Sequence, residues 1–277
     1  MIREPAPAKL NLALHVRRRR PDGYHELETL FAFCRDGDAV ELASAAENRF
    51  RVVGPFAAEL ARDEPWADNL VTRAADAFAD AFGVAGRHDV TLAKNLPIAS
   101  GIGGGSADAA ATLRALARLH GVDRRDPRLR AVAAGLGADV PACLDGRATL
   151  GRGRGDDLEP VDGLPGVPVL LVNPGVPVST AAVFRLWDGV DRGPVGDGPP
   201  LDRARAGRND LEAPARLLAP AIDEALALLG AQAGVLLARM SGSGATCFAL
   251  FADKGARDAA GRAAAARGWW RLETALA

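Results

Sequence analysis

The stretch Leu96-Pro-Ile-Ala-Ser-Gly101-Ile-Gly103-Gly104-Gly105-Ser106-Ala-Asp108-Ala-Ala110 decides the fold, because its glycines run directly into an alanine-rich segment. Glycine lets backbone N–H groups turn toward an anion and approach it closely. The segment 107–120 predicts a helix that Gly121 ends, and a helix N-terminus offers unpaired amides and a positive dipole. With the charge of Lys94 just upstream, the stretch predicts a site for a di- or triphosphate.

Other phosphate-binding loops do not fit this stretch. A P-loop needs a lysine directly after its last glycine, and none follows here. A dinucleotide fingerprint needs a third glycine where Ser106 stands, which disfavours a nicotinamide oxidoreductase. The later motifs of protein kinases are absent from the sequence. A flexible loop before a helix remains the plain alternative.

The rest of the chain predicts short strands mixed irregularly with helices, which favours an α+β fold over a doubly wound sheet. Apolar spacing and turn signals predict strands at 6–16, 27–33, 39–42, 50–53, 90–93, 167–172 and 247–251, and helices starting at Asp68-Asn69 and spanning 107–120, 214–229 and 256–267. The segment 151–166 is rich in glycine, acid and proline, which predicts a boundary between domains 1–155 and 156–277. The segment 189–200 predicts a mobile surface loop.

Composition limits the function classes. The chain has 277 residues, 48% of them hydrophobic, and 34 basic side chains balance 35 acidic ones. A nucleic-acid binder is normally strongly basic, and a membrane span needs about 18 apolar residues in a row, so we expect neither partner. Cys34, Cys143 and Cys247 lie far apart, which predicts no disulfide framework, no zinc site and a reducing, cytoplasmic location.

Lysine is rare in this chain, since only Lys9, Lys94 and Lys254 are lysines among the 34 basic residues. Lysine is a compact point charge that arginine does not replace in a tight site, so its retention beside the motifs is a functional signal. Asp139 stands in the apolar segment Gly137-Ala-Asp-Val-Pro141. It is either a solvated helix-terminal residue or a buried acid that a lysine keeps ionised to accept a proton. Spacing alone does not bring residues 9 and 139 together.

Five motifs, in this order, resemble the GHMP kinase superfamily over nearly the whole chain: Pro7-Ala-Lys-Leu-Asn-Leu12, Asp22-Gly-Tyr-His25, the Gly101–Ser106 loop, Gly137–Pro141 and Ser241-Gly-Ser-Gly244. The first, second and fourth are typical of the branch that phosphorylates a cytidine-diphosphate-linked methylerythritol in the non-mevalonate isoprenoid pathway. The resemblance implies a ribosomal S5 domain 2-like N-terminal domain and a ferredoxin-like C-terminal domain, with a cleft between them. It also implies transfer of the ATP γ-phosphoryl group to the 2-hydroxyl of that substrate.

Carried over residue by residue, the resemblance implies three groups of site residues. Asp139 would be the catalytic base and Lys9 its partner. The nucleotide would be bound by Lys94, Asn69, Gly101, Gly103, Gly104, Gly105 and Ser106. The substrate would be bound by Asn11, Tyr24, His25, Phe184, Gly242 and Gly244. The cofactors would be ATP and Mg²⁺, and the protein a monomer or homodimer.

Two departures from the family pattern stand out. Arg17 and Arg18 extend a basic run to Arg20, which predicts a solvated turn and leaves a substrate-phosphate contact open. Gly104 and Gly105 replace the hydroxyl residues of other branches, so no magnesium ligand is assigned. Two alternatives remain: another member of the superfamily, such as a homoserine or mevalonate kinase, and a catalytically silent binding protein with the same fold.

Overall fold

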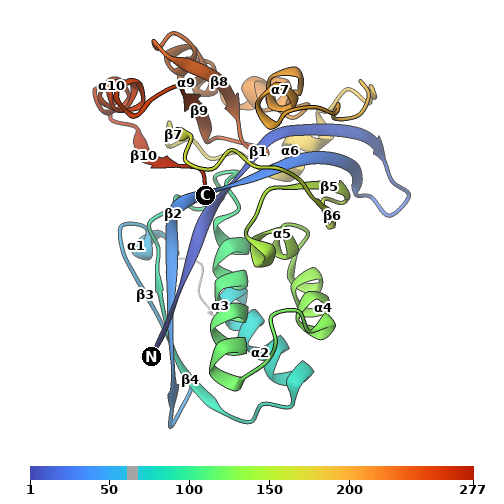
Figure 1. Ribbon diagram of the computed structural model, residues 1–277, viewed down its shortest axis with the longest axis vertical. Helices are drawn as coiled ribbons and strands as arrows, with labels where there is room; N and C mark the ends of the chain where they lie inside the picture. The colour runs from blue at the N-terminus through green and yellow to red at the C-terminus, as the bar shows by residue number, and fades with distance from the viewer. Residues whose placement is uncertain (61–67) are drawn as a thin grey trace. The chain divides into compact units, whose positions relative to one another are not determined.

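The computed structural model describes residues 1–60 and 68–277. They form two compact units: unit 1 contains 1–8, 36–98 and 103–146, and unit 2 contains 9–35, 99–102 and 147–277. Figure 1 colours the chain from end to end, so both units can be followed in it. The chain passes from unit 1 to unit 2 for the last time between residues 146 and 147, before the predicted boundary at 155/156. The segment around that boundary is not a linker, because it contains β5 (Thr149–Gly153) and β6 (Asp157–Pro160), which pair antiparallel within unit 2.

The two longest strands, β1 (Ile2–Arg19) and β2 (His25–Ala45), contribute residues to both units. The sequence predicted two short strands at 27–33 and 39–42, but β2 runs without a break through both. Gly37 lies between the two predicted segments, and a Cβ atom there would come within 2.2 Å of the Ala6 carbonyl oxygen. Glycine at this position therefore allows β1 and β2 to approach closely within unit 1.

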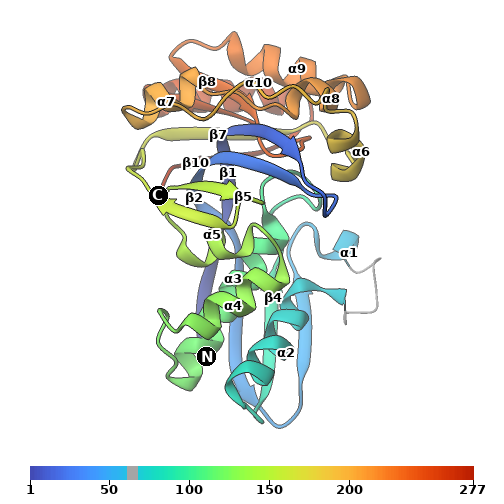
Figure 2. The same ribbon diagram turned by 90° about the vertical axis from the view of Figure 1, so that its right-hand side faces the viewer.

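Unit 1 packs helices on one face of a small sheet. Strand β4 (Arg87–Ala93) pairs parallel with β3 (Arg49–Val53) and antiparallel with residues 39–45 of β2. The helices are α1 (Ala57–Leu60), α2 (Leu70–Phe82), α3 (Gly104–His120), α4 (Pro127–Leu136) and α5 (Val140–Asp145). Figure 2 shows α2, α3 and α4 lying together over these strands.

The ends of the two central helices of unit 1 confirm the sequence signals. Asn69 caps α2, since its side-chain oxygen accepts the Val71 N–H at 2.9 Å. Gly121 ends α3 in the left-handed conformation. Helix α3 begins at Gly104, three residues before the predicted start, because Gly103 takes the left-handed conformation and serves as its N-cap.

Unit 2 contains a four-stranded antiparallel sheet in the order β10-β7-β9-β8. The strands are β7 (Pro168–Asn173), β8 (Val235–Met240), β9 (Cys247–Phe251) and β10 (Trp270–Ala275). The helices are α6 (Thr180–Arg185), α7 (Pro200–Ala206), α8 (Glu212–Leu218), α9 (Ala221–Gly230) and α10 (Lys254–Ala265). The β-α-β-β-α-β order confirms the ferredoxin-like prediction, with α9 and α10 over one face (Figure 2).

The predicted helix 214–229 is wrong in one respect, because it is two helices, α8 and α9, separated at Ala219 and Pro220. Proline has no N–H to donate, so it cannot continue α8 and instead stands at the start of α9.

The predicted loop 189–200 is irregular, as expected, but several contacts fix it. His15 Nδ1 lies 3.1 Å from the Gly193 carbonyl oxygen, and Glu28 accepts the Val195 N–H at 2.9 Å. Arg17 pairs with both Glu28 and Asp191. The loop is thereby tied to β1 and β2.

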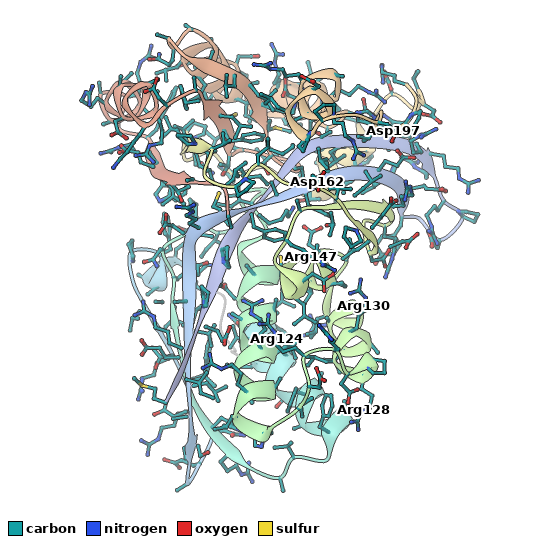
Figure 3. All side chains as sticks on the ribbon, in the orientation of Figure 1. Arg124, Arg128, Arg130, Arg147, Asp162 and Asp197 are labelled. Atoms are coloured by element: carbon teal, nitrogen blue, oxygen red, sulfur yellow. The ribbon has the colours of Figure 1, made fainter. Side chains whose placement is uncertain are left out.

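Surface arginines are largely paired with nearby acids. On α4, Arg128 and Arg130 extend outward (Figure 3) and pair with Asp126 and Asp145. Within residues 1–60 and 68–277, no helix combines the length and the apolar character that crossing a membrane requires.

Candidate active site

The glycine loop is shared between the two units. Gly103, Gly104, Gly105 and Ser106 form the start of α3 in unit 1, and Gly101 belongs to unit 2. No side chain caps α3. The Ala107 N–H donates to the carbonyl oxygen of the N-cap residue, Gly103, and so makes the hydrogen bond that begins the helix. The N-terminus of this 17-residue helix can therefore receive an anion, as the sequence predicted.

Lys94 lies directly behind this helix start. A Cβ atom on Gly104 would come within 3.1 Å of Lys94 Nζ. The ammonium group also lies 2.6 Å from Asp38 and 2.7 Å from Asp108, and all three side chains are at most 4% exposed. Lys94 is therefore a fixed charge held by two carboxylates rather than a mobile one. Its contact with a nucleotide stays a prediction.

The charges of this cluster perturb one another. Burial alone would lower the pKa of Lys94, but Asp108 and Asp38 together outweigh it and raise the pKa, so the ammonium stays charged. Burial, with Asp38 adding to it and Lys94 opposing it, raises the pKa of Asp108 to about 7. No sequence signal marked Asp38 or Asp108 as a site residue, although Asp108 stands inside the segment 96–110.

Two more predicted residues belong to unit 1. The Asn69 side chain caps α2, so one of its polar atoms already has a structural partner. Asp139 is partly buried between α4 and α5, at the N-cap position of α5. Its carboxylate does not cap that helix. This position does not decide between a solvated helix-terminal residue and a buried catalytic acid.

Lys9 and Asn11 lie together in unit 2, on β1. Lys9 is 3% exposed, donates from Nζ to Asn11 Oδ1 at 3.0 Å, and lies over the Phe31 ring. The Asn11 amide group in turn donates to Thr29 Oγ at 2.7 Å. Asn11 therefore holds the Lys9 ammonium in place, and Thr29 holds Asn11.

The two small-residue loops of unit 2 interlock. A Cβ atom on Gly101 would come within 2.4 Å of the Ser241 carbonyl oxygen and 2.8 Å of the Gly244 one. A Cβ atom on Gly242 would come within 2.7 Å of the Gly101 carbonyl oxygen. The Ser241 hydroxyl donates to that oxygen at 3.0 Å and accepts the Asn11 N–H at 3.2 Å. Both glycines are therefore required for close backbone packing beside Asn11.

His25 and Phe184, predicted to act on one ligand, are in contact. Their ring centroids are 4.7 Å apart in a stacked arrangement, and Trp187 meets His25 edge-on at 5.7 Å. Burial first, and then Arg19, lowers the pKa of His25, so the ring is neutral at pH 7. Its buried Nε2 atom has no hydrogen-bond partner among the described residues. Tyr24, next in the chain, is 57% exposed, with the Arg154 guanidinium 5.5 Å from its ring.

Trp187 was missed by sequence reasoning because nothing in its spacing marks it. The basic run is not the predicted turn, because β1 continues as a strand to Arg19; Arg17, Arg18 and Arg20 pair with nearby carboxylates. The described residues contain no group of three or more His, Cys, Asp or Glu side chains able to hold a metal ion.

Comparison with known proteins defines the class first. A model described as the GHMP kinases N terminal domain matches residues 69–147, and one described as GHMP kinases C terminal matches 196–268. Together they cover more than half of the chain, which therefore belongs to the GHMP kinases and is a small-molecule kinase.

Relatives narrow the family further. The chain is 57% identical over 277 residues to 4-diphosphocytidyl-2-C-methyl-D-erythritol kinase of Rhizorhabdus wittichii, covering 99% of this chain and 94% of that protein. The kinase of the same name from Novosphingobium aromaticivorans is 51% identical, with coverages of 99% and 93%. A crystal structure of 4-(cytidine 5'-diphospho)-2C-methyl-D-erythritol kinase superposes with a TM-score of 0.78 at 36% identity, covering 99% of both chains. The resemblance inferred from the motifs is thus confirmed, and the chain is a member of this kinase family.

Homoserine kinase from Cytophaga hutchinsonii, 19% identical with a TM-score of 0.70 over 99% of this chain and 95% of that one, shares the fold.

Proposed function

We propose that this protein transfers the γ-phosphoryl group of ATP to the 2-hydroxyl of 4-diphosphocytidyl-2-C-methyl-D-erythritol, in the non-mevalonate route to isoprenoid precursors. The observation that carries the proposal is the match to kinases of that name at 57% and 51% identity over nearly their full length. ATP as the phosphoryl donor is the expectation for a GHMP kinase.

The phosphates of ATP would bind at the start of α3. The backbone amides of Gly104, Gly105 and Ser106 and the helix dipole would neutralise phosphate charge, with Gly101 and Gly103 shaping the loop and Asn69 near the nucleotide. Phosphoryl transfer passes through a loose transition state, so positioning and charge neutralisation supply most of the rate. The absence of a side-chain cap on α3 supports this role.

Magnesium would be held mainly by the nucleotide. Mg²⁺ commonly binds through one or two carboxylates together with substrate phosphates and water, so a site without an all-protein cage is compatible with it. When bound, the ion neutralises charge on the β- and γ-phosphates. No protein ligand is assigned to it.

The acceptor hydroxyl would be served by Asp139, with Lys9 as its partner. The alcohol oxygen forms a bond to the γ-phosphorus, the bond from that phosphorus to the bridging oxygen of ADP breaks, and Asp139 accepts the alcohol proton late in the step. A loose transition state requires little activation of the nucleophile, so a well-placed carboxylate would suffice as the base. The buried Lys9 ammonium, fixed by Asn11, supports a role in orienting charge.

The cytidine base would bind at Tyr24, His25 and Phe184. The neutral His25 ring with its unpartnered Nε2 atom supports recognition of a base edge, and an unpaired polar group in such a pocket strongly penalises analogues that lack the match. The Phe184 and His25 rings stack on each other, so the Phe184 ring would have to move away from His25 to admit a base between them. Gly242 and Gly244 would line the floor beside Asn11.

An ADP-release assay tests the proposal. The enzyme is given ATP with the diphosphocytidyl substrate, homoserine or mevalonate, and only the first should support turnover. Asp139→Asn should lower kcat by about 10²–10⁴ while ATP still binds, the range typical of losing a general base. Asp145→Asn, at the other end of α5 and paired with Arg130, is the matched control and should retain activity.

Three results would contradict parts of this proposal. Preferred turnover of homoserine or mevalonate would place the chain in another branch of the GHMP kinases, and absence of turnover with all three would favour a silent binding protein. An Asp139→Asn variant within twofold of the wild-type kcat would remove Asp139 from the role of base.

A further inference from the structure

A buried cluster in unit 1 carries more negative than positive charge. Asp38 and Asp108 share the single ammonium group of Lys94, at 2.6 Å and 2.7 Å. With both acids ionised, the cluster holds one uncompensated negative charge in a site from which water is almost excluded. Buried charges are costly unless they are paired, so one of the two carboxyl groups has a strong tendency to hold a proton.

The hydrogen bonds identify Asp108 as that group. Asp38 Oδ1 accepts the backbone N–H groups of Asn95 and Leu96, which stabilise its charged form. Asp108 has no such support, because its buried Oδ1 lacks a hydrogen-bond partner among the described residues.

The surroundings of Asp108 leave its titration to this cluster. The charged groups that face it are Lys94, after β4, and Asp38, in β2. The fully buried side chains of the helices that pack against α3 are hydrocarbon except for the Cys143 thiol of α5. Burial and Asp38 raise the pKa of Asp108 to about 7, so the group is partly protonated at neutral pH.

This cluster lies directly behind the glycine loop. Asp108 is two residues after Ser106 on α3, and Lys94 Nζ would be 3.1 Å from a Cβ atom on Gly104. A polyphosphate bound to the amides of this helix start would bring further negative charge close to Asp108. In a medium of low polarity the added charge favours the neutral form of the carboxyl group.

We propose that Asp108 is a positioning residue that takes up a proton from solvent when nucleotide phosphates bind the glycine loop. The proton neutralises Asp108 and leaves Asp38 and Lys94 as a balanced ion pair behind the phosphates. The inference rests on the proposed function, because it needs phosphates at the start of α3. It makes nucleotide affinity depend on pH through a side chain that does not touch the nucleotide.

The expected effect follows from Coulomb's law. One negative charge placed roughly 8 Å away, at an effective dielectric constant of about 20, raises a carboxyl pKa by about 1.5. A group that is half protonated at pH 7 then becomes almost fully protonated. We therefore expect uptake of about 0.5 proton for each nucleotide bound at pH 7.

Calorimetric titration of the whole enzyme with ATP and excess Mg²⁺, in two buffers of different ionisation enthalpy, measures this uptake. Phosphate groups themselves titrate near pH 6, so the quantity compared is wild type minus Asp108→Asn. Asn resembles the protonated acid but cannot titrate. The Asp108→Asn variant should therefore keep its nucleotide affinity and lose the proton uptake that Asp108 contributes. Asp123→Asn, beyond the other end of α3, is the matched control and should behave as wild type.

A second variant keeps the test decisive should Asp108→Asn not fold. Asp38→Asn removes the neighbouring charge that raises the pKa of Asp108, so proton uptake should decline at pH 7 and move to lower pH. Equal uptake by wild type and Asp108→Asn, or an unmoved pH window in Asp38→Asn, would overturn the inference and leave the kinase assignment intact. Wild-type protein that binds no ATP would overturn the kinase assignment as well.

Discussion

The close approach of two loops in unit 2 makes Gly101→Ala an informative substitution. Gly101 has φ +79°, and a Cβ atom there would come within 2.4 Å of the Ser241 carbonyl oxygen and 2.8 Å of the Gly244 one. Both neighbours are backbone atoms, so they cannot swing aside as the end of a side chain can. Substitution therefore adds a steric clash to the strain of a left-handed alanine.

The two costs can be separated within the same unit. Gly175 has φ +77°, nearly the same conformation, and nothing lies within 4 Å of a Cβ atom there. Gly175→Ala should thus cost only the conformational strain, about 1–2 kcal/mol. Gly101→Ala should add about 1–3 kcal/mol for overpacking, a total of about 2–5 kcal/mol.

Urea unfolding at 25 °C, followed by circular dichroism, gives both free energies of unfolding, and their difference isolates the clash. The kinase assay adds a second readout, because a displaced Gly101 disturbs Ser241 and, through it, Asn11. We expect lost activity in Gly101→Ala and retained activity in Gly175→Ala. Equal destabilisation of the two variants would refute the argument that loop packing requires glycine at 101.

Three further outcomes follow from the site. Tyr24→Ala should raise KM for the diphosphocytidyl substrate by about 5- to 150-fold, the value of one base stack, and leave KM for ATP within twofold; equal losses for both ligands would make Tyr24 merely structural. Lys94→Met strands two buried carboxylates and should lower the free energy of unfolding by about 3–5 kcal/mol, with partial recovery on adding Asp108→Asn; a loss under 1 kcal/mol in urea unfolding would argue against the ion cluster. Burial, and then Arg208, lowers the pKa of His15, so His15 becomes protonated in the unfolded chain before it does in the folded protein as the pH falls. The free energy of unfolding should therefore be highest above about pH 6.5 and decline below it, more steeply in wild type than in His15→Phe. Parallel pH curves for the two proteins would contradict this.

Local signals predicted the elements of the fold better than their connections. Asn69 and Gly121 mark helix ends through their own chemistry, a side-chain acceptor and a left-handed backbone, and both lie where expected. The break between the predicted strands 27–33 and 39–42 is wrong, because a glycine such as Gly37 interrupts an apolar pattern in the same way in a turn and between two closely packed strands. The partition into units depends on long-range pairing, which no window of sequence contains.

The site was predicted unevenly for the same reason. Glycines 101, 242 and 244 and His25 lie in recognisable motifs, Phe184 was expected only from the resemblance, and the structure places all five in one unit. Asp38 and Trp187 acquire their importance from neighbours that are distant in the chain, Lys94 for one and His25 for the other. A carboxylate in a strand or an indole just after a short helix carries no local mark of such a partner.

The choice between lysine and arginine shows how composition carried information about the site. Arg239 is buried, and its guanidinium donates to the carbonyl oxygens of Leu12, Ala204 and Gly207, which suits a planar fork with five donors. Lys94 instead lies between two carboxylates, with the Gly104 backbone close on another side, where a compact ammonium fits and a guanidinium is too large. Lys9, equally buried, meets Asn11 under the same constraint, whereas the exposed Lys254 does not. Two of the three lysines in this arginine-rich chain, Lys9 and Lys94, are thus buried in tight surroundings, where space as well as charge determines the residue.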